Sequence, residues 1–483
     1  MAGFNTPPPL RTDTEISRKF LLVGFGAIAQ ALVPLLFAHF ACRPADIAIL
    51  SADTNGLELA NRYGLHHDVI AVTQDNHAAL LAKRLNPGDM LINLSVEVSS
   101  LALIDWCQAH DVLYIDTCVE PWAGGYETLA NGETRPTTNY ALRHAALSRS
   151  RPDTPTAVIA HGANPGLVSH FVKAALHELA ALRGLAAPPA DWARLAQMLD
   201  VRVIHIAEWD TQVTDMPQGK DEFQNTWSVD GLLAESRQPA ELGWGSHEGA
   251  LPTDGRTHAS GSRAAIYLNR RSAEVKVKSW VPLAGEQEAY LITHHEAISI
   301  AEWLTVPGTS AERPQYRPTV HYAYAPCPAA RASLNAWVAA GYPRPARRTV
   351  LRDELVEGTD QLGVLLVFPG GAFWYGSTLD LNEARRLAPY NNATTLQVAA
   401  GVLGGIVWML AHPRAGIVEA ESLDHRMILE AATPYLGHLG GTLTDWQPDG
   451  CGDLRFSSFR LGEATRAKSR HPLHEPAEVE VPA

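Results

Sequence analysis

Apolar residues in the first third of the chain fall into two alternating patterns. Short apolar runs, such as residues 20–23 and 47–50, have the length of buried strands. The segments between them, such as residues 57–63, repeat apolar residues every three or four positions, which is typical of amphipathic helices. This alternation predicts a parallel sheet with helices on both faces, so we expect a Rossmann-type, doubly wound α/β domain over residues 1–163. Its expected strands are residues 20–23, 47–50, 69–72, 90–94, 112–116 and 156–160.

The pattern changes after residue 163. A long amphipathic helix is expected over residues 167–182. From residue 201 onward, short apolar runs are punctuated by glycine and proline, which predicts an inserted α+β domain with a mostly antiparallel sheet over residues 164–387. The further elements expected in it are a helix over 192–199 and strands over 201–207, 226–229, 264–268, 275–281, 289–293, 321–324 and 363–368.

The C-terminal part of the chain returns to helical character. Residues 388–412 form a long apolar stretch, and the run 398–411 within it is too short to span a bilayer, so we expect a buried helix. We assign residues 388–483 to a segment that returns to the first domain. Its last 20 residues are polar and contain proline, and we expect them to form a frayed tail.

The first predicted strand runs into a glycine turn. Residues 23–30 read VGFGAIAQ, which places Gly24, Gly26 and Ala29 in the G-x-G-x-x-A pattern of dinucleotide-binding folds. Gly24 allows a sharp turn, Gly26 lets the backbone approach a pyrophosphate, and the helix N-terminus offers free N–H groups to the anion. The alternative is a glycine turn without a ligand, but the strand before it and the helix after it favour a nucleotide site.

The carboxyl ends of the predicted strands supply the other cofactor candidates, because these ends form the ligand crevice of an open α/β sheet. The second strand is followed by Ser51 and Asp53, one of which would contact the ribose; Asp53 could also be only a helix N-cap. No arginine stands at that strand end, which favours NAD over NADP. The full set of cofactor-binding candidates is Gly24, Gly26, Ala27, Ile28, Ser51, Asp53, Asn93, Leu94, Ser95, Asp116 and Thr117.

The charge balance narrows the classes of partner. With 39 basic and 52 acidic residues the chain carries a formal charge of −13, which argues against nucleic acid and anionic membranes and mildly favours a cationic substrate. Five scattered cysteines without metal-binding spacing are typical of reduced thiols. The N-terminus shows no signal-peptide pattern. We therefore expect a cytoplasmic protein that acts on small molecules, with no metal and no membrane partner.

Acidic and aromatic residues of the second domain form the second chemical signal. A site for an alkyl diamine needs carboxylates at its ends, an apolar wall and an aromatic face for cation–π contact. Glu208, Trp227, Glu235, Glu296 and Asp360 could supply these groups. Each also has a structural alternative, since Glu296 could be a helix-start acid and Trp227 a core residue.

A glycine-rich crossing between the two domains is a further candidate. Residues 161–166 read HGANPG, between a predicted strand and a predicted helix. Glycines beside Asn-Pro favour a close backbone approach to a ligand, although an interdomain turn would have the same composition.

Taken together, these segments resemble the bacterial homospermidine synthases, of the saccharopine-dehydrogenase-like group. The resemblance runs from about residue 20 to residue 446 and includes DTCVEPW (116–122), HIAEWDTQ (205–212) and NTWSVDG (225–231). It implies an NAD-dependent enzyme that condenses two putrescines, or spermidine and putrescine, to sym-homospermidine. Ammonia is released, imines are intermediates, and NAD is not consumed.

The resemblance also implies roles for individual residues. Glu208 and Asn164 match positions near the reacting amine, and Trp227 matches a cation–π tryptophan that stabilises the cationic imine. Proton transfer is expected from a carboxylate or from His294 rather than from Lys173. The implied catalytic residues are Glu208, Trp227, Asn164 and His294, and the implied substrate-binding residues are Glu120, Glu235, Glu296 and Asp360.

Two features leave alternatives open. The family pattern has aspartate where this chain has Ser51, which affects the ribose contact. A net saccharopine- or carboxyspermidine-type dehydrogenase would need an arginine clamp for a substrate carboxylate, and Arg256, Arg263 and Arg317 are available. A non-catalytic NAD-sensing protein is the alternative from another class.

A homodimer, formed through the sheet of the inserted domain, is implied by the resemblance alone.

Overall fold

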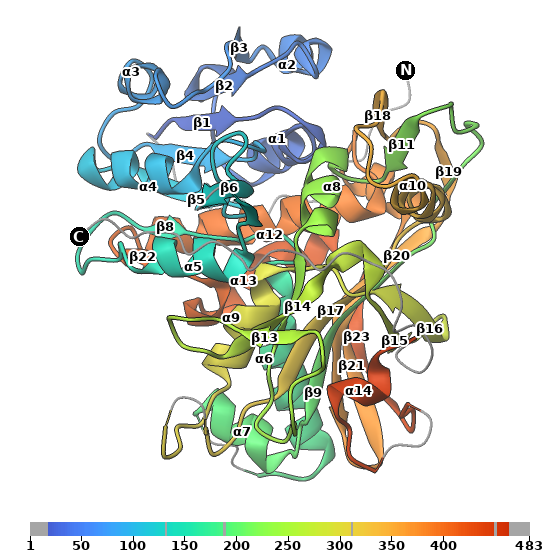
Figure 1. The fold of residues 1–483 in the computed structure, drawn as a ribbon. Coiled ribbons are helices and arrows are strands. Elements are labelled where there is room, and N and C mark those ends of the chain that lie inside the picture. The colour runs from blue at the N-terminus through green and yellow to red at the C-terminus, as the bar shows by residue number, and fades with distance from the viewer. Residues whose placement is uncertain (1–17, 131–132, 187–189, 311–312, 449–451, 463–483) are drawn as a thin grey trace.

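The glycine turn belongs to a sheet that is parallel throughout. The computed structural model describes residues 18–130, 133–186, 190–310, 313–448 and 452–462 (Figure 1). Seven strands lie in the order β22-β8-β5-β4-β1-β2-β3, which is the arrangement of a dinucleotide-binding domain and confirms the predicted fold class. The strands are β1 (Phe20–Val23), β2 (Ile47–Ser51), β3 (His66–Val69), β4 (Met90–Asn93), β5 (Leu113–Asp116), β8 (Ala157–Val158) and β22 (Ile417–Val418).

Helices cover both faces of the parallel sheet because alternate side chains of each strand point to opposite faces. Phe20 and Leu22 of β1 pack in one apolar cluster with the helix that follows the glycine turn, while Leu21 and Val23 pack in another. The helices of this part are α1 (Ala27–His39), α2 (Leu57–Tyr63), α3 (His77–Ala82), α4 (Ser100–Ala109) and α5 (Asn139–Leu147), and the hairpin β6 (Glu127–Ala130) and β7 (Glu133–Pro136) stands apart from the sheet.

One predicted strand of this domain was misplaced. The apolar run at residues 69–72 predicted a strand, but β3 ends at Val69, and both Val69 and Ile70 are exposed. In the part of the chain that the structure describes, β3 is the edge strand and pairs with β2 alone, with His66 opposite Ala48 and Val69 opposite Ser51. Backbone pairing to β2, rather than apolar burial, therefore sets its limits.

The second large sheet has ten strands and is mixed. Its main path is β13-β14-β12-β17-β9-β20-β21-β23, and the β15–β16 hairpin joins it through β17. β17 and β9 run parallel, and the other neighbours are antiparallel, which confirms the mostly antiparallel sheet. The strands are β9 (Val203–Asp210), β12 (Pro239–Gly243), β13 (Gly255–Thr257), β14 (Ala265–Arg271), β15 (Lys276–Val281), β16 (Gly285–Tyr290), β17 (Thr319–Ala325), β20 (Thr359–Phe368), β21 (Gly371–Asp380) and β23 (His438–Thr444).

The strand predicted over residues 226–229 is wrong. A short strand ends at Asn225, and Ser228 caps the next helix by accepting a hydrogen bond from the Gly231 N–H. The capping serine, and not the apolar alternation, decides the local structure. The remaining elements are β10 (Val213–Thr214), β11 (Glu222–Asn225), β18 (Arg347–Val350), β19 (Leu355–Glu357), α6 (Leu167–Leu182), α7 (Trp192–Met198), α8 (Val229–Arg237), α9 (His295–Trp303), α10 (Pro328–Ala339), α11 (Leu381–Leu387), α12 (Ala393–Ala411), α13 (His425–Ala432) and α14 (Phe456–Phe459).

The C-terminal segment contacts both sheets. β22 joins the parallel sheet beside β8, β23 joins the large sheet beside β21, and α12 packs on α1 and β5 (Figure 1). α12 begins upstream of the apolar run at 398–411 and is long and apolar enough to cross a membrane. However, 83% of its most apolar 18-residue stretch is buried inside the protein. The boundaries at residues 163 and 387 stay a prediction. The expected frayed tail, the last 20 residues, lies outside the described residues.

Candidate active site

The glycine turn fits a dinucleotide. Gly24 has φ +85°, and a Cβ there would lie 2.8 Å from the Leu94 carbonyl oxygen and from Ser95 Cα, so this position requires glycine. A Cβ on Gly26 would meet no protein atom within 4 Å, which leaves its backbone open to a ligand. α1 begins at Ala27 without a side-chain cap, so the N–H groups of its first turn remain available to an anion.

The expected ribose residues differ in their surroundings. Ser51 is buried; its hydroxyl donates to the Asp53 carbonyl oxygen over 2.7 Å and lies 2.6 Å from Nε2 of His67. Asp53 is exposed, and its carboxylate accepts from the Asn55 N–H. The ring of His67 faces Phe25 of the glycine turn with centroids 5.4 Å apart. His67 therefore adds an imidazole, which we did not predict, to this end of the crevice.

The candidates on β4 and β5 are tied to one another. The Asn93 amide donates to the Tyr114 hydroxyl over 3.2 Å, and Tyr114 donates to Asp116 over 2.7 Å. Asp116 also accepts the Ala160 N–H over 2.7 Å, and burial raises the pKa of its carboxyl to about 6. This chain of hydrogen bonds fixes the turn that leads into the HGANPG segment. Thr117 packs against that segment at Gly162.

Glu208 lies at the centre of the candidate substrate residues. It sits on β9, where Tyr324 of β17 and Leu362 of β20 are its neighbours in register. Its Oε2 accepts hydrogen bonds from the Asn164 amide, over 2.9 Å, and from the Tyr322 hydroxyl. Burial raises the pKa of Glu208 to about 7, and the nearby Asp210 adds to the rise. A carboxylate with this pKa can exchange a proton near neutral pH.

Three buried carboxyls share one face of β9 and β20. Glu208 and Asp210 are two residues apart on β9, and Asp360 of β20 is the register partner of Asp210. Burial, then the charges of Glu208 and Asp210, raise the pKa of Asp360 well above its ordinary value, and burial raises that of Asp210 to about 6. Asp360 accepts a hydrogen bond from Thr394, while its Oδ1 is buried without a partner among the described residues. Such a cluster is suited to a positively charged ligand.

A second acidic group surrounds His294. Its Nδ1 lies 3.1 Å from Glu296 and its Nε2 lies 3.2 Å from Glu235. Although burial alone lowers the pKa of this imidazole, the two carboxylates raise it well above its ordinary value, so His294 is held as a cation. Its ring packs on Tyr322 with centroids 4.4 Å apart, which connects this group to Glu208.

Trp227 and Glu120 complete the cluster. The half-buried indole of Trp227 donates its N–H to the Tyr324 hydroxyl over 3.0 Å. Glu120 accepts the Glu97 N–H over 3.1 Å, and burial raises its pKa to about 7, with the charge of Glu235 contributing. The four catalytic candidates and the four substrate-binding candidates are therefore linked through direct contacts or electrostatic coupling.

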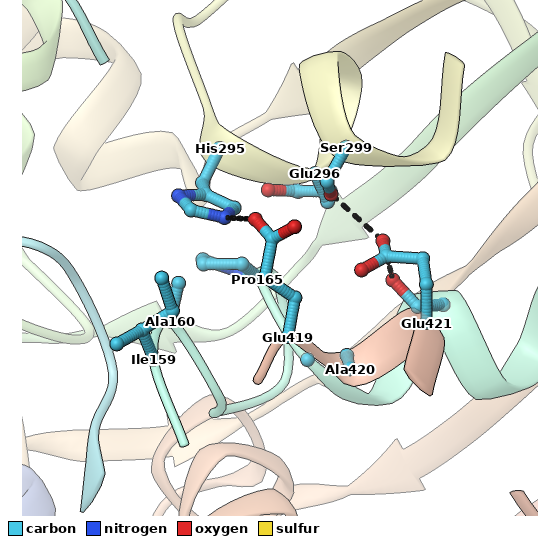
Figure 2. A pocket seen from close by; sticks show the side chains of 11 residues that line it. Ile159, Ala160, Pro165, His295, Glu296, Ser299, Glu419, Ala420 and Glu421 are labelled. Atoms are coloured by element: carbon cyan, nitrogen blue, oxygen red, sulfur yellow. Dashed lines mark hydrogen bonds and ion pairs between the residues drawn. The ribbon is translucent and has the colours of Figure 1, made fainter. Parts of the chain in front are cut away.

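Figure 2 shows how α9 anchors this group to the C-terminal segment. His295, next in the chain to His294, bonds to Glu419 over 2.6 Å. Ser299, one turn further on, donates to Glu421 over 2.7 Å. Glu296 lines the same small cavity, and its Oε2 is buried without a partner among the described residues. The segment around residue 420 thus supports the helix that presents Glu296.

The donors to the site carboxylates are neutral or imidazole groups. Glu208, Asp210, Asp360, Glu235, Glu296 and Glu120 accept from amide, hydroxyl and backbone N–H groups or pair with the imidazole of His294. Of the arginines considered for a carboxylate clamp, Arg317 donates to Thr305 and to the carbonyls of Trp244 and Arg263, and Arg256 donates to backbone carbonyls of its own loop. The site thus carries the negative charge that is suited to a substrate with ammonium groups.

Sequence reasoning missed Asp210, Tyr322 and Tyr324. The alternation Glu208-Trp209-Asp210 places two acids on one face of a strand, and this could have indicated Asp210. Residues 322–324 read Tyr-Ala-Tyr on a predicted strand, which places both rings on one face. Which face that is depends on pairing with β9, and no local pattern carries that information.

Comparison with known proteins supports the same architecture. Residues 20–157 match the saccharopine dehydrogenase NADP-binding domain, and residues 162–444 match the saccharopine dehydrogenase C-terminal domain. The homospermidine synthase of Mesorhizobium japonicum is 45% identical over 448 residues, covering 90% of this chain and 92% of that protein. That of Blastochloris viridis is 45% identical over 445 residues, covering 90% and 93%.

A solved structure is similar over nearly the whole chain. The homospermidine synthase of Legionella pneumophila, determined in complex with NAD, has a TM-score of 0.86 and 42% sequence identity. The similarity covers 94% of this chain and 99% of that one.

Proposed function

The chain belongs to the homospermidine synthase family, with the two domains of the saccharopine dehydrogenases, and we propose that it condenses two putrescines to sym-homospermidine with release of ammonia. Spermidine is the alternative aminobutyl donor. The reaction passes through imines and leaves the redox state of NAD unchanged. The observation that carries the proposal is the group of buried carboxyls around Glu208, whose hydrogen-bond donors are neutral groups and one imidazole.

The glycine turn supports NAD as the bound cofactor. Gly24 and Gly26 would let the pyrophosphate approach the N-terminus of α1, with Ser51 or Asp53 toward the ribose and the ends of β4 and β5 toward the nicotinamide. NAD, when bound, accepts a hydride and later returns it. The exposed carboxylate of Asp53 and the absence of arginine from the stretch that ends β2 support NAD over NADP.

Glu208 is suited to receive the proton that the substrate ammonium must lose before a hydride can leave its carbon. Its carboxylate is buried, is held by Asn164 and Tyr322, and has a pKa of about 7, so it can take up a proton at neutral pH and later release it. The departing amine needs a proton in return, and the same carboxyl can supply it. No covalent lysine intermediate is needed, and Lys173 donates instead to the carbonyls of Ala420, Glu421 and Leu423.

The other residues hold charge in place. Trp227 offers an aromatic face to the cationic imine. Oδ1 of Asp360, which has no partner among the described residues, could accept from an ammonium group, and Glu235 faces His294 at another part of the cluster. Glu120, Glu296 and His294 line the reaction centre in this proposal. Enclosure by these groups limits hydrolysis of the imine.

We further propose a cytoplasmic homodimer. The resemblance to the family supports both statements, and light scattering of the purified protein tests the second, because a monomeric mass would contradict it.

The function is tested by incubating the purified protein with putrescine and NAD. We expect homospermidine and ammonia in equal amounts and no net change in NADH absorbance. Stoichiometric accumulation of NADH would instead indicate a net dehydrogenase, and binding of NAD without any product would indicate a sensor protein.

A further inference from the structure

We propose that Tyr322 and Tyr324 of β17 are positioning residues of this site: Tyr322 fixes the carboxylate of Glu208, and Tyr324 fixes the indole of Trp227. The inference rests on the proposed function. It gives a role to two tyrosines that do not bind the substrate in the scheme above.

Tyr322 joins the two acidic groups of the site. Its hydroxyl donates to Oε2 of Glu208, the same oxygen that accepts from Asn164. Its ring packs on the imidazole of His294, with centroids 4.4 Å apart. Two donors from different elements thus converge on one carboxylate oxygen, which limits rotation of the carboxyl.

Tyr324 holds the aromatic face. Its hydroxyl accepts the Trp227 N–H over 3.0 Å, and this is the only polar group of the indole. Trp227 lies in the loop before α8 and is only half buried, so packing alone restrains it less than a core residue. A hydrogen bond from a strand residue therefore sets the angle at which the indole faces the site.

The two tyrosines form one rigid unit. Their rings stack with centroids 5.4 Å apart, and both are at most 1% exposed. β17 runs parallel to β9 with Tyr324 in register with Glu208, so backbone pairing fixes the unit relative to the carboxylate. Phenylalanine would fill the same space, yet both buried hydroxyls are bonded to candidate catalytic groups. The hydrogen bonds of their hydroxyl groups, rather than their volume, are therefore what tyrosine provides at these positions and phenylalanine would not.

Loss of the Tyr322 hydroxyl has a directional consequence. A donor to a carboxylate stabilises its ionised form, so Tyr322→Phe should raise the pKa of Glu208. The other groups that face Glu208 remain: Asp210 on β9, Asp360 on β20, Asn164 before α6 and His294 before α9. Tyr324 is not bonded to Glu208, and Tyr324→Phe should instead lower turnover without moving the pKa.

The test measures kcat/KM for putrescine against pH in the wild type, Tyr322→Phe, Tyr324→Phe and Tyr316→Phe. Tyr316 is the matched control, because its buried hydroxyl donates to the Val201 carbonyl over 2.7 Å, outside the site. For Tyr322→Phe we expect the acid limb to move upward by about one pH unit, which is the size expected for loss of one hydrogen bond to a charged group. Tyr324→Phe should lose several-fold in kcat at every pH, and Tyr316→Phe should follow the wild type.

An unshifted acid limb in a folded Tyr322→Phe protein would overturn the role of Tyr322, and wild-type kcat in Tyr324→Phe would overturn that of Tyr324. If Tyr322→Phe does not fold, 3-fluorotyrosine at position 322 keeps the shape and makes the hydroxyl a stronger donor. The acid limb should then move downward, and no movement would overturn the proposal. A wild-type protein without turnover of putrescine would instead refute the proposed function, so the two failures are distinguishable.

Discussion

Replacement of Glu208 by glutamine should strongly lower activity and, at alkaline pH, stabilise the protein. The amide keeps the shape of the side chain, and its oxygen can still accept from Asn164 and Tyr322. It removes the group that takes the substrate proton, and loss of a general base typically costs about 10²–10⁴ in rate. It also removes a charge that burial disfavours.

The magnitude follows from the pKa. Burial, with Asp210, raises the pKa of Glu208 from 4.5 to about 7 in the folded protein. The destabilisation of the folded protein by this carboxyl is absent below pH 4.5. It grows between pH 4.5 and about 7, where the unfolded chain is ionised and the folded carboxyl still holds its proton, and it is constant above that range. Fully developed, it amounts to about 3 kcal/mol. For a chain of 483 residues that unfolds as one unit, this corresponds to about 3 °C in the unfolding midpoint.

The assay compares thermal unfolding of the wild type and Glu208→Gln at a pH below 4.5 and at a pH well above 7. Glu58→Gln, at an exposed residue of α2, is the matched control and should behave as the wild type at both pH values. The gain in stability from Glu208→Gln should appear only at the higher pH. An equal gain at both pH values, or a loss at the higher one, would refute the burial of an ionisable carboxyl as the basis of its reactivity.

Three further predictions concern the substrate and the cofactor. Trp227→Leu should lower kcat by about 30-fold, because a desolvated cation–π contact contributes about 2 kcal/mol. Trp227→Phe keeps an aromatic face but loses the hydrogen bond to Tyr324, so it should lose only several-fold, as Tyr324→Phe does; equal rates in the Leu and Phe variants, by steady-state assay, would argue against the cation–π role. Glu235→Gln should raise KM for putrescine more than it lowers kcat, since we expect a remote ammonium contact, and a wild-type KM with collapsed turnover would contradict this. Gly26→Ala should fold normally but weaken NADH binding, measured by fluorescence, because its Cβ meets open space where the pyrophosphate would lie; Gly24→Ala should also lose thermal stability, because its Cβ lies 2.8 Å from the Leu94 carbonyl oxygen. Undiminished NADH binding by Gly26→Ala would place the cofactor elsewhere.

The fold was predictable where local chemistry and global pairing agree. The strand at Phe20–Val23, the glycines after it and the helix from Ala27 all follow from the sequence alone. Prediction failed at β3, where pairing with β2 shifts the strand toward His66, and at residues 226–229, where Ser228 starts a helix instead. In both cases the residues are compatible with two structures, and contacts distant in sequence or a single cap choose between them.

The sequence indicated which residues belong to the candidate site, but not how they are arranged. The resemblance indicated Glu208 and Asp360, which lie about 150 positions apart, and pairing of β9 with β20 brings them together. Asp210 and Tyr322 were missed because their importance comes from the face of the sheet they occupy. The ribose contact stays a prediction: Ser51 is bonded to His67 and Asp53 is exposed, and neither arrangement follows from the sequence.

The fate of deuterium during turnover tests the return of the hydride to the substrate. Putrescine deuterated at both terminal carbons would be converted in the presence of NAD and added unlabelled NADH, and the product would be analysed by mass spectrometry. We predict that homospermidine retains every deuterium atom and that the NADH in solution stays unlabelled. Loss of deuterium from the product, or its appearance in free NADH, would contradict an enclosed site that stores the hydride and gives it back.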